Sequence, residues 1–332
     1  ALWSSGIKQI DNLEMMYLQM AAKTSKIIEK ERPDKIHLLN FESIPFASIY
    51  YKLRYKLPCF ATVNGPIFSC FIQTGIDYKG ETCVDCRLGK RARCSTHKWG
   101  LKGVLFYMYS LYYMAMLRLS YRFIDKFFIV SEAMRPVLTS MGVDEKKIVK
   151  IYNPIELAKG NAVRKNTMLY VGRLSPEKGV DTLIEALAKL PKHKLIIVGE
   201  KKGEYLKLSA LAKKLGIEKH VTFTGYVDNK DLSRYYEMAD VAVLPGRYYE
   251  PLSRFLIEAT SYGLPLVARD IGGNSEILNE GKNGLFFTDD LPSTITQVYS
   301  NWETYSKNSK KIAVKFDIKT VGAQLMKEYG VI

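Results

Sequence analysis

Short apolar runs recur through the second half of the chain, and each is followed by a stretch with helical spacing. The runs are residues 168–171, 194–198, 221–224, 241–244 and 265–268. Strands that alternate with helices predict right-handed β-α-β units, and hence a parallel sheet covered by helices on both faces. Such a sheet binds its ligand at the carboxyl ends of the strands. We therefore expect a Rossmann-like domain whose site lies in the loops after these strands.

The first half of the chain repeats this alternation less regularly. Apolar strands are expected at residues 36–39, 57–63, 125–130 and 148–152. A polar stretch without periodicity, residues 153–166, reads as a linker, and 332 residues suit two domains of ordinary size. We predict an α/β protein with domains at residues 1–155 and 156–310, followed by a helix at residues 311–332.

The chain is basic, with a formal net charge of +15 and a pI of about 9.4. Residues 1–155 hold 23 basic and 13 acidic residues, a net charge of +10. A basic surface attracts nucleic acid, anionic lipid or phosphorylated substrates, and charge alone does not choose among them. We expect no specific nucleic acid partner, because no recognition element is present. No signal peptide and no run of about 18 apolar residues is visible, so we expect a cytoplasmic protein, free or peripheral on the inner face of the membrane.

The segment from residue 245 to residue 263 carries the main candidate site. Pro251 suits a first helical position, with Glu250 just before the helix and Glu258 about two turns into it. The backbone N–H groups of Ser253 and Arg254 would then lie at the positive helix end, which favours a phosphate. Glu258 would lie roughly 12 Å further along the axis, within reach of a ribose. A helix with an acidic first turn and one buried, paired glutamate explains the same spacing.

Two cations follow the first strand of this half. Residues 172–179 read GRLSPEKG and place Arg173 and Lys178 at the carboxyl end of the strand at 168–171. Two cations and a helix N-terminus together make a good diphosphate clamp. Glycines mark three further strand exits, where a ligand can approach the backbone closely or the chain merely turns: Gly199, Gly225 and Gly246.

Taken together, these segments resemble retaining glycosyltransferases of the GT-B fold, family 4 type. Glu250 and Glu258 are separated by seven residues, like the E-x7-E motif of that family, and GRLSPEKG resembles its G-R-L-x-x-x-K-G stretch. The likeness continues in TGYV (224–227), ADVAVLP (239–245), EPLSRFLIEA (250–259) and GGNSEIL (272–278). It runs over residues 131–290. Arg254 stands where the family often has glycine, which is tolerable if only its backbone N–H is used.

The resemblance implies two Rossmann-like domains facing a cleft, with the last helix crossing back to the first domain. The first strand and glycine-rich loop of the family's amino-terminal domain are not found in this sequence. It also implies a metal-independent, retaining transfer of a hexose-type sugar from a UDP- or GDP-sugar to a glycan or lipid-linked acceptor. The implied catalytic residues are Glu250, Arg173 and Lys178. The implied donor-binding residues are Gly172, Arg173, Lys178, Val227, Pro251, Leu252, Ser253, Arg254 and Glu258.

Each donor-side residue has an implied role. Arg173 and Lys178 would neutralise the leaving diphosphate, Glu250 would bind hydroxyls of the donor sugar, and Glu258 would hold the ribose. Loss of Lys178 is then expected to lower turnover by orders of magnitude with little change in melting temperature.

On the acceptor side, Asn64 falls where the family often has a histidine, and an amide cannot act as a base. This departure and the missing amino-terminal loop favour an alternative, a nucleotide-sugar-binding protein of the same fold that does not catalyse transfer.

Four cysteines fall within a polar loop predicted over residues 65–98. Thiolates at this density suit a structural zinc ion or an iron–sulfur cluster, and some members of the family carry a similar loop. Unligated thiols or disulfides are the competing interpretations. The candidate ligands are Cys70, Cys83, Cys86 and Cys94.

A helix rich in Tyr, Met and Leu is expected at residues 100–123, with no acidic residue between Arg87 and Ile124. Apolar residues on nearly all sides favour a core helix. Lys98 and Lys102 at its start favour a second interpretation, in which part of it meets an anionic membrane. We expect most of it to be core, with the cationic start facing the membrane or the cleft.

Overall fold

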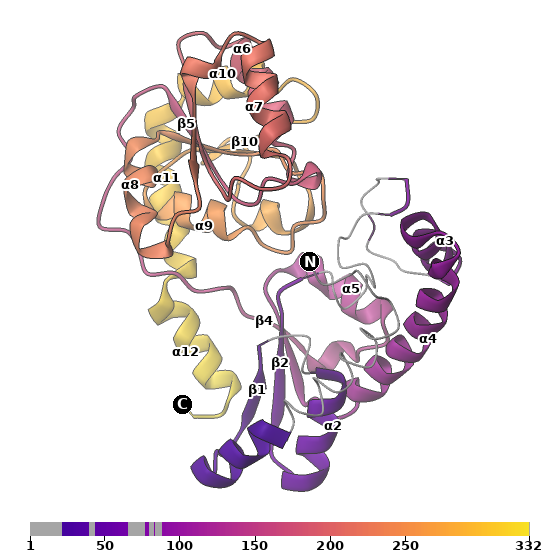
Figure 1. Ribbon diagram of the computed structural model, residues 1–332. Coiled ribbons are helices and arrows are strands. Elements are labelled where there is room, and N and C mark those ends of the chain that lie inside the picture. The colour runs from indigo at the N-terminus through magenta and orange to yellow at the C-terminus, as the bar shows by residue number, and fades with distance from the viewer. Residues whose placement is uncertain (1–21, 40–43, 66–76, 80–82, 84–87, 332) are drawn as a thin grey trace. The chain divides into compact units, whose positions relative to one another are not determined.

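The computed structural model describes residues 22–39, 44–65, 77–79, 83 and 88–331. The chain divides into two compact units, residues 1–151 and 152–332. Each unit is built on its own parallel sheet (Figure 1). The α/β class predicted from the sequence is therefore confirmed.

The first unit contains a four-stranded parallel sheet in the order β1-β2-β3-β4. Its strands are β1 (Ile36–Leu38), β2 (Cys59–Val63), β3 (Lys126–Ile129) and β4 (Ile148–Lys150). Its helices are α2 (Ile44–Tyr55), α3 (Leu88–Trp99), α4 (Lys102–Tyr121) and α5 (Arg135–Ser140). A further helical stretch, residues 22–31, precedes β1. All four predicted strands are confirmed, each slightly shorter than expected.

Helix α3 corrects the prediction of a single cysteine loop over residues 65–98. From Leu88 onward the chain is helical, and Cys94 is buried on this helix. Helix α3 packs against α4, and Gly103 permits the contact because a Cβ there would collide with the carbonyl oxygen of Ser95. The basic residues of this stretch hid the helix from a pattern search that relied on apolar spacing.

Helix α4 has two apolar faces. One is core, with Phe106, Tyr113, Met114 and Leu117 buried, as expected for most of this helix. The opposite face exposes apolar side chains at Leu101, Leu105, Met108, Tyr112 and Leu119. Within the described ranges, no helix has both the length and the apolar character needed to span a bilayer.

The second unit contains a six-stranded parallel sheet in the order β10-β9-β8-β5-β6-β7. Its strands are β5 (Thr167–Val171), β6 (Lys194–Val198), β7 (Val221–Gly225), β8 (Val241–Leu244), β9 (Leu266–Ala268) and β10 (Gly284–Phe286). The five predicted strands are confirmed. The sixth, β10, has only three residues in a polar surrounding, which is too short for a periodic signal.

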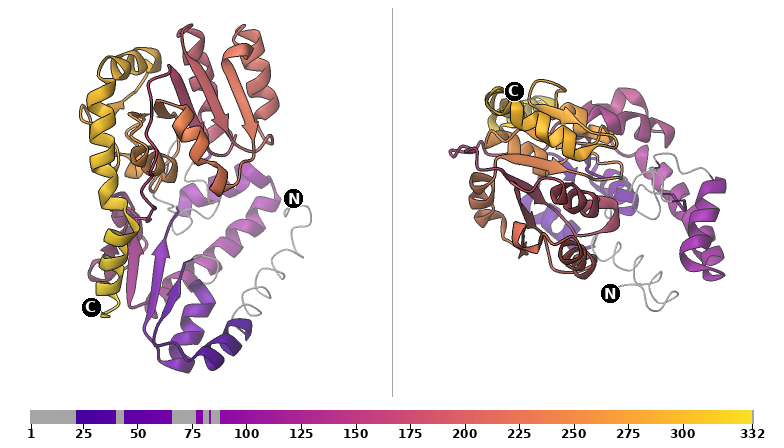
Figure 2. Two further views of the ribbon diagram at one scale, coloured as in Figure 1. Left: turned by 90° about the vertical axis from the view of Figure 1, so that its left-hand side faces the viewer. Right: turned by 90° about the horizontal axis from the view of Figure 1, so that it is seen from above.

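Helices cover both faces of this sheet. Helices α6, α7 and α10 pack together on one face, and α9 packs with α11 on the other (Figures 1 and 2). The helices are α6 (Val180–Ala188), α7 (Tyr205–Lys214), α8 (Ser233–Met238), α9 (Arg254–Ser261), α10 (Leu291–Ser300), α11 (Trp302–Ala313) and α12 (Ile318–Glu328). The segment before α12 pairs with the start of the unit, because Ile155 N donates to Phe316 O at 2.9 Å.

The strand order places a topological switch point between β5 and β8. From β5 the chain builds the sheet in one direction through β6 and β7, then returns to the other side of β5 with β8 and continues to β9 and β10. The loops after β5 and β8 therefore run in opposite directions from neighbouring strand ends. A crevice forms at such a point, and open α/β sheets bind their ligands there.

Asp240 anchors the opposite, amino-terminal edge of the sheet. Its side chain is fully buried, and Oδ1 accepts hydrogen bonds from Thr167 N at 2.8 Å and from Tyr299 OH at 2.7 Å. Oδ2 accepts from the backbone N–H groups of Asn166 and Lys165. One carboxylate thus joins the starts of β5 and β8 to helix α10.

We predict that Asp240→Ala lowers the free energy of unfolding by about 3–5 kcal/mol, because it leaves several buried donors without an acceptor. Urea unfolding followed by circular dichroism measures this change. Asp231→Ala removes an exposed carboxylate from the same unit and should change stability by less than about 0.5 kcal/mol. Equal effects of the two substitutions would refute the anchoring role.

Candidate functional site

Three loops at the carboxyl edge of the second sheet meet around Glu250. Gly179, after β5, has φ of +65°, and a Cβ there would lie 2.5 Å from the carbonyl oxygen of Pro245, after β8. The loop after β9 contributes Gly273, whose N–H donates to the carbonyl oxygen of Glu250 at 2.8 Å. Gly272 is left-handed, and a Cβ there would collide with the same Glu250 carbonyl. Glycine is needed at both positions to bring the loops together.

Lys178 and Glu250 form an ion pair at this junction. Lys178 Nζ lies 3.0 Å from Glu250 Oε2, and the two side chains are only 12% and 14% exposed. Lys178 follows β5 and Glu250 follows β8, so the pair joins the two loops of the switch point. An ion pair with this little solvent is screened far less than a surface pair.

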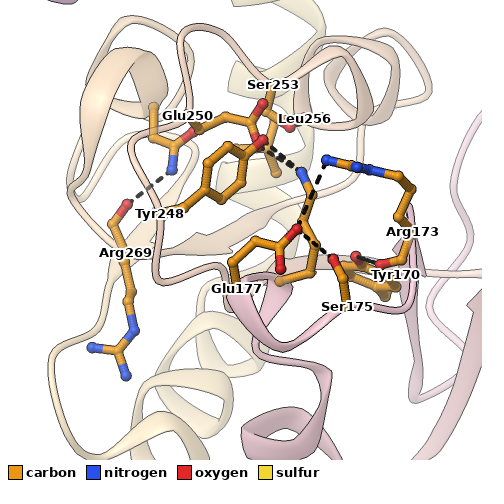
Figure 3. Close-up of polar contacts among 11 residues, drawn as sticks. Tyr170, Arg173, Ser175, Glu177, Tyr248, Glu250, Ser253, Leu256 and Arg269 are labelled. Atoms are coloured by element: carbon orange, nitrogen blue, oxygen red, sulfur yellow. Dashed lines mark hydrogen bonds and ion pairs between the residues drawn. The ribbon is translucent and has the colours of Figure 1, made fainter. Parts of the chain in front are cut away.

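Tyr248 completes the cluster, and the sequence analysis did not identify it. Its hydroxyl donates to Glu250 Oε2 (Figure 3). The same hydroxyl accepts from Lys178 Nζ at 2.6 Å, and the ring centroid lies 4.2 Å from Lys178 Nζ. Burial, and then the neighbouring Glu250 carboxylate, raise the pKa of Tyr248, so the hydroxyl stays protonated at neutral pH. The sequence signal that could have identified Tyr248 is its position, two residues before Glu250 of the motif.

Arg173 lies on the exposed side of the same loop. Its guanidinium is 3.8 Å from Glu177 Oε1 and its side chain is 77% exposed. Ser175 Oγ donates to the same Glu177 oxygen at 2.6 Å (Figure 3). Tyr170 OH donates to the carbonyl of Arg173 at 2.9 Å and fills the space beside Gly172, where a Cβ would lie 2.6 Å from it. The backbone of this loop is thus fixed, while the Arg173 side chain can turn toward a ligand.

Helix α9 begins at Arg254 rather than near Pro251, which corrects the expected start. Ser253 is extended and caps the helix, since its Oγ accepts from Leu256 N at 3.3 Å. This cap outcompetes proline as a helix start because it satisfies an orphan N–H. The backbone N–H groups of Arg254 and Phe255 then open the helix. Pro251 and Leu252 lie in the loop before it and are buried.

Glu258 therefore lies one helical turn from Arg254, not two turns from the helix start. Tyr236 OH donates to Glu258 Oε2 at 2.7 Å, and Arg254 Nε donates to Oε1 at 3.2 Å. The Arg254 side chain is 64% exposed and that of Glu258 25%. The Arg254 side chain therefore makes a contact with Glu258 that a glycine at this position could not make. Burial, and then Glu258, raise the pKa of Tyr236, so its hydroxyl remains a donor.

The remaining residue predicted to bind the donor, Val227, follows the edge strand β7 and is half-buried. It lies two strands from β5, about 10 Å at the usual strand spacing. Asn64 belongs to the first unit, is exposed and follows β2.

The four-stranded sheet of the first unit also contains a histidine that the sequence analysis did not single out. This residue is His37 on β1, whose Nε2 lies 2.7 Å from Thr62 Oγ1. Burial lowers the pKa of His37, which favours its neutral form.

The predicted metal in the cysteine loop finds no support among the residues that the structure describes. In those ranges no three His, Cys, Asp or Glu side chains are placed to hold a metal ion. Cys70 and Cys86 lie outside the described residues. Of the other two, Cys94 is buried and Cys83 Sγ lies 3.8 Å from Lys90 Nζ.

Comparison with known proteins identifies the family. Residues 155–313 match the sequence model described as Glycosyl transferases group 1, and residues 9–159 match that of Glycosyltransferase Family 4. Together the two matches extend over residues 9–313. The chain belongs to the group 1, family 4 type glycosyltransferases, and the resemblance found in the sequence is confirmed.

Individual relatives are similar to this chain over part of its length. Spore coat protein SA of Bacillus subtilis (strain 168) is 38% identical over 134 residues, which are 38% of this chain and 36% of the relative. D-inositol 3-phosphate glycosyltransferase of Mycobacterium sp. (strain KMS) is 36% identical over 125 residues, 36% of this chain and 28% of the relative. The matched part is thus about a third of each relative's length.

Among solved structures, Anabaena HepE superposes with a TM-score of 0.74 at 20% identity, over 95% of this chain and 82% of that chain. This likeness shows that the two chains share the GT-B fold, as predicted.

We predict that Lys178→Ala lowers the free energy of unfolding by about 1–3 kcal/mol, because it leaves the shielded Glu250 carboxylate without its cation. The sequence alone suggested little change in melting temperature, and the 12% exposure of Lys178 is the reason for revising that expectation. Chemical unfolding at neutral pH measures the loss. Lys192→Ala, at an exposed position before β6, provides the control and should leave stability unchanged. A Lys178 variant as stable as the wild type would contradict the pairing.

Proposed function

We propose that this protein is a retaining glycosyltransferase that moves a hexose-type sugar from a nucleotide diphosphate sugar to a glycan or lipid-linked acceptor. The observation that carries the proposal is the Lys178–Glu250 pair, 3.0 Å apart at the switch point of the second sheet. A cation for a phosphate and a carboxylate for sugar hydroxyls meet there, where an open α/β sheet binds its ligand.

The site must first stabilise the negative charge of the leaving diphosphate. Lys178 carries three N–H donors, of which Tyr248 and Glu250 take two, so one remains for a phosphate oxygen. Arg173 turns from Glu177 to the same group, since its side chain is largely exposed. The N–H groups that open α9 add the positive helix end. Stabilising charge on a leaving group is usually the largest catalytic contribution.

The two motif carboxylates, Glu250 and Glu258, bind different parts of the donor. Glu250 accepts hydrogen bonds from donor-sugar hydroxyls, and Glu258 from the ribose, which replaces Arg254 on Oε1 while Tyr236 keeps Oε2. Val227, at the end of β7, offers backbone groups to the base edge. Gly172, Pro251, Leu252 and Ser253 shape the surrounding loops.

Transfer in this site needs no protein nucleophile. The bond from the anomeric carbon to the diphosphate oxygen breaks, and the acceptor oxygen bonds to the same face of the sugar. The configuration is retained because the new bond forms on the face from which the old bond breaks, and the charges balance because the acceptor proton passes to the departing diphosphate oxygen. No metal ion is needed, because the two cations take the charge that a metal would otherwise bear.

The donor is a UDP- or GDP-sugar. Anabaena HepE, which shares the fold, was solved in complex with UDP, and this supports uracil as the first base to test. A chain that binds the nucleotide sugar without transferring it is the alternative function. The amide of Asn64, which cannot act as a base, favours that alternative.

We predict that the wild type binds UDP in isothermal calorimetry and slowly hydrolyses or transfers from a UDP- or GDP-sugar. Lys178→Ala should weaken binding of the diphosphate at least ten-fold and lower turnover at least a hundred-fold, since removal of one stabilising donor at a developing charge typically costs about 10²–10³-fold. Lys192→Ala, at the opposite edge of the sheet, should keep both properties.

Three outcomes distinguish the candidate functions. Binding with turnover that depends on Lys178 supports the transferase. Binding without any turnover supports the non-catalytic alternative. A chain that binds no nucleotide diphosphate, or a Lys178→Ala variant with wild-type turnover, removes the proposed site.

We further propose that the exposed face of α4 contacts an anionic membrane, which would bring a lipid-linked acceptor to the protein. Leu105 and Met108 are each 59% exposed and Leu101 is 94% exposed on this face. Exposed cations, Lys102 and Arg118, lie on the same helix. A second copy packed here in an antiparallel arrangement would bring these cations together, so charge favours an anionic surface.

We predict that the protein binds vesicles of phosphatidylcholine and phosphatidylglycerol more tightly than vesicles of phosphatidylcholine alone, and less tightly as salt rises. Leu105→Glu should weaken this binding about ten-fold or more, because it removes an inserted apolar side chain and adds a like charge. Leu206→Glu, at a 77% exposed leucine of the second unit, is the matched control. Equal binding by both variants would exclude α4 as the contact.

A further inference from the structure

We infer that Tyr248 is a positioning residue that sets the orientation of the Glu250 carboxylate toward the donor sugar. This inference rests on the function proposed above and assigns a role to a residue outside the motifs of the sequence. It starts from three contacts of one side chain: a hydrogen bond from Lys178, a hydrogen bond to Glu250, and an aromatic ring against the Lys178 ammonium.

The proton positions in this cluster follow from the donors and acceptors. An ammonium only donates, so Lys178 Nζ gives a hydrogen bond to the Tyr248 oxygen. The single hydroxyl hydrogen of Tyr248 is then directed to Glu250 Oε2. Since burial and Glu250 both raise the pKa of Tyr248, this hydrogen stays in place at neutral pH. The three groups form one ordered arrangement rather than a loose contact.

This arrangement makes the two oxygens of Glu250 different. Oε2 accepts from both Lys178 Nζ and Tyr248 OH. No residue in the described ranges donates a hydrogen bond to Oε1. With Oε2 held by two donors and the Glu250 carbonyl held by Gly273 N, the carboxylate has little freedom to rotate. Oε1 is therefore presented in a fixed direction, where a hydroxyl of the donor sugar can donate to it.

Tyr248 acts on the reaction through Glu250 and not by touching the sugar. Its hydroxyl contacts both the Lys178 ammonium and the Glu250 carboxylate, which also contact each other, and Figure 3 shows the contact with Glu250. A carboxylate displaced by about 1 Å can cost on the order of 100-fold in rate, which is the scale expected for losing such an orienting group. Binding of UDP, which lacks the sugar, should depend little on this orientation.

Tyr248→Phe tests this role, since it removes the hydroxyl and keeps the ring against Lys178. We expect kcat for transfer or donor hydrolysis to fall 10- to 100-fold, with Kd for UDP within about three-fold of the wild type. Tyr299→Phe is the matched control, because it also removes a buried tyrosine–carboxylate hydrogen bond, to Asp240 at 2.7 Å, at the opposite sheet edge. It should lower stability and leave kcat unchanged.

A double-mutant cycle separates orientation from general stability. In a Glu250→Ala background, Tyr248→Phe should lower kcat by less than about two-fold, because its effect passes through the missing carboxylate. The inference is overturned if Tyr248→Phe keeps kcat within two-fold of the wild type, or if its loss is the same in both backgrounds. A wild type with neither UDP binding nor turnover removes the proposed function, and this role with it. An active wild type that is indifferent to Tyr248→Phe removes the Tyr248 role alone.

Discussion

The attraction between the Lys178 ammonium and the Glu250 carboxylate depends on the order of the strands. These side chains are 72 positions apart in the sequence, yet they lie 3.0 Å apart because β5 and β8 are neighbours in the sheet. Both strands end at the same edge of the sheet, and the loops that follow them run in opposite directions from there. The pair is therefore a product of topology, and any sheet order that separated β5 from β8 would abolish it.

The loops that carry this pair, and the strands before them, are held in place at both edges of the sheet. Glycines at 179 and 272 allow the three loops to approach within contact distance, and neither could carry a side chain without strain. At the other edge, the Asp240 side chain ties the start of β8 to the start of β5 with three hydrogen bonds and to helix α10 with a fourth. The same two strands are thus fixed at one end by a buried carboxylate and joined at the other by an ion pair. A site held in this way can orient a bound group without being remodelled by it.

Much of this organisation could be predicted from the sequence. The strands of the second unit are near-continuous apolar runs, so their positions, the parallel sheet and the loops that carry Lys178 and Glu250 all followed from periodicity. Long-range pairing was less accessible. Tyr248 belongs to no recognisable motif, and its proposed role depends on Lys178, which lies 70 positions away in the sequence. The start of α9 was misplaced because Ser253 supplies a cap that outcompetes proline. Helix α3 was missed because its polar residues gave no apolar pattern, and the exposed face of α4 could be separated from its core face only once its neighbours were known.

The arrangement joins a phosphate-binding cation, Lys178, and a sugar-binding carboxylate, Glu250, in one cluster, with the Tyr248 hydroxyl bonded to both. A crystal structure of this protein with UDP tests that account most directly. The account predicts diphosphate oxygens within about 3 Å of Lys178 Nζ and of the N–H groups that open α9, with the ribose on Glu258. A diphosphate bound elsewhere in the second unit, without any contact to Lys178, would contradict it.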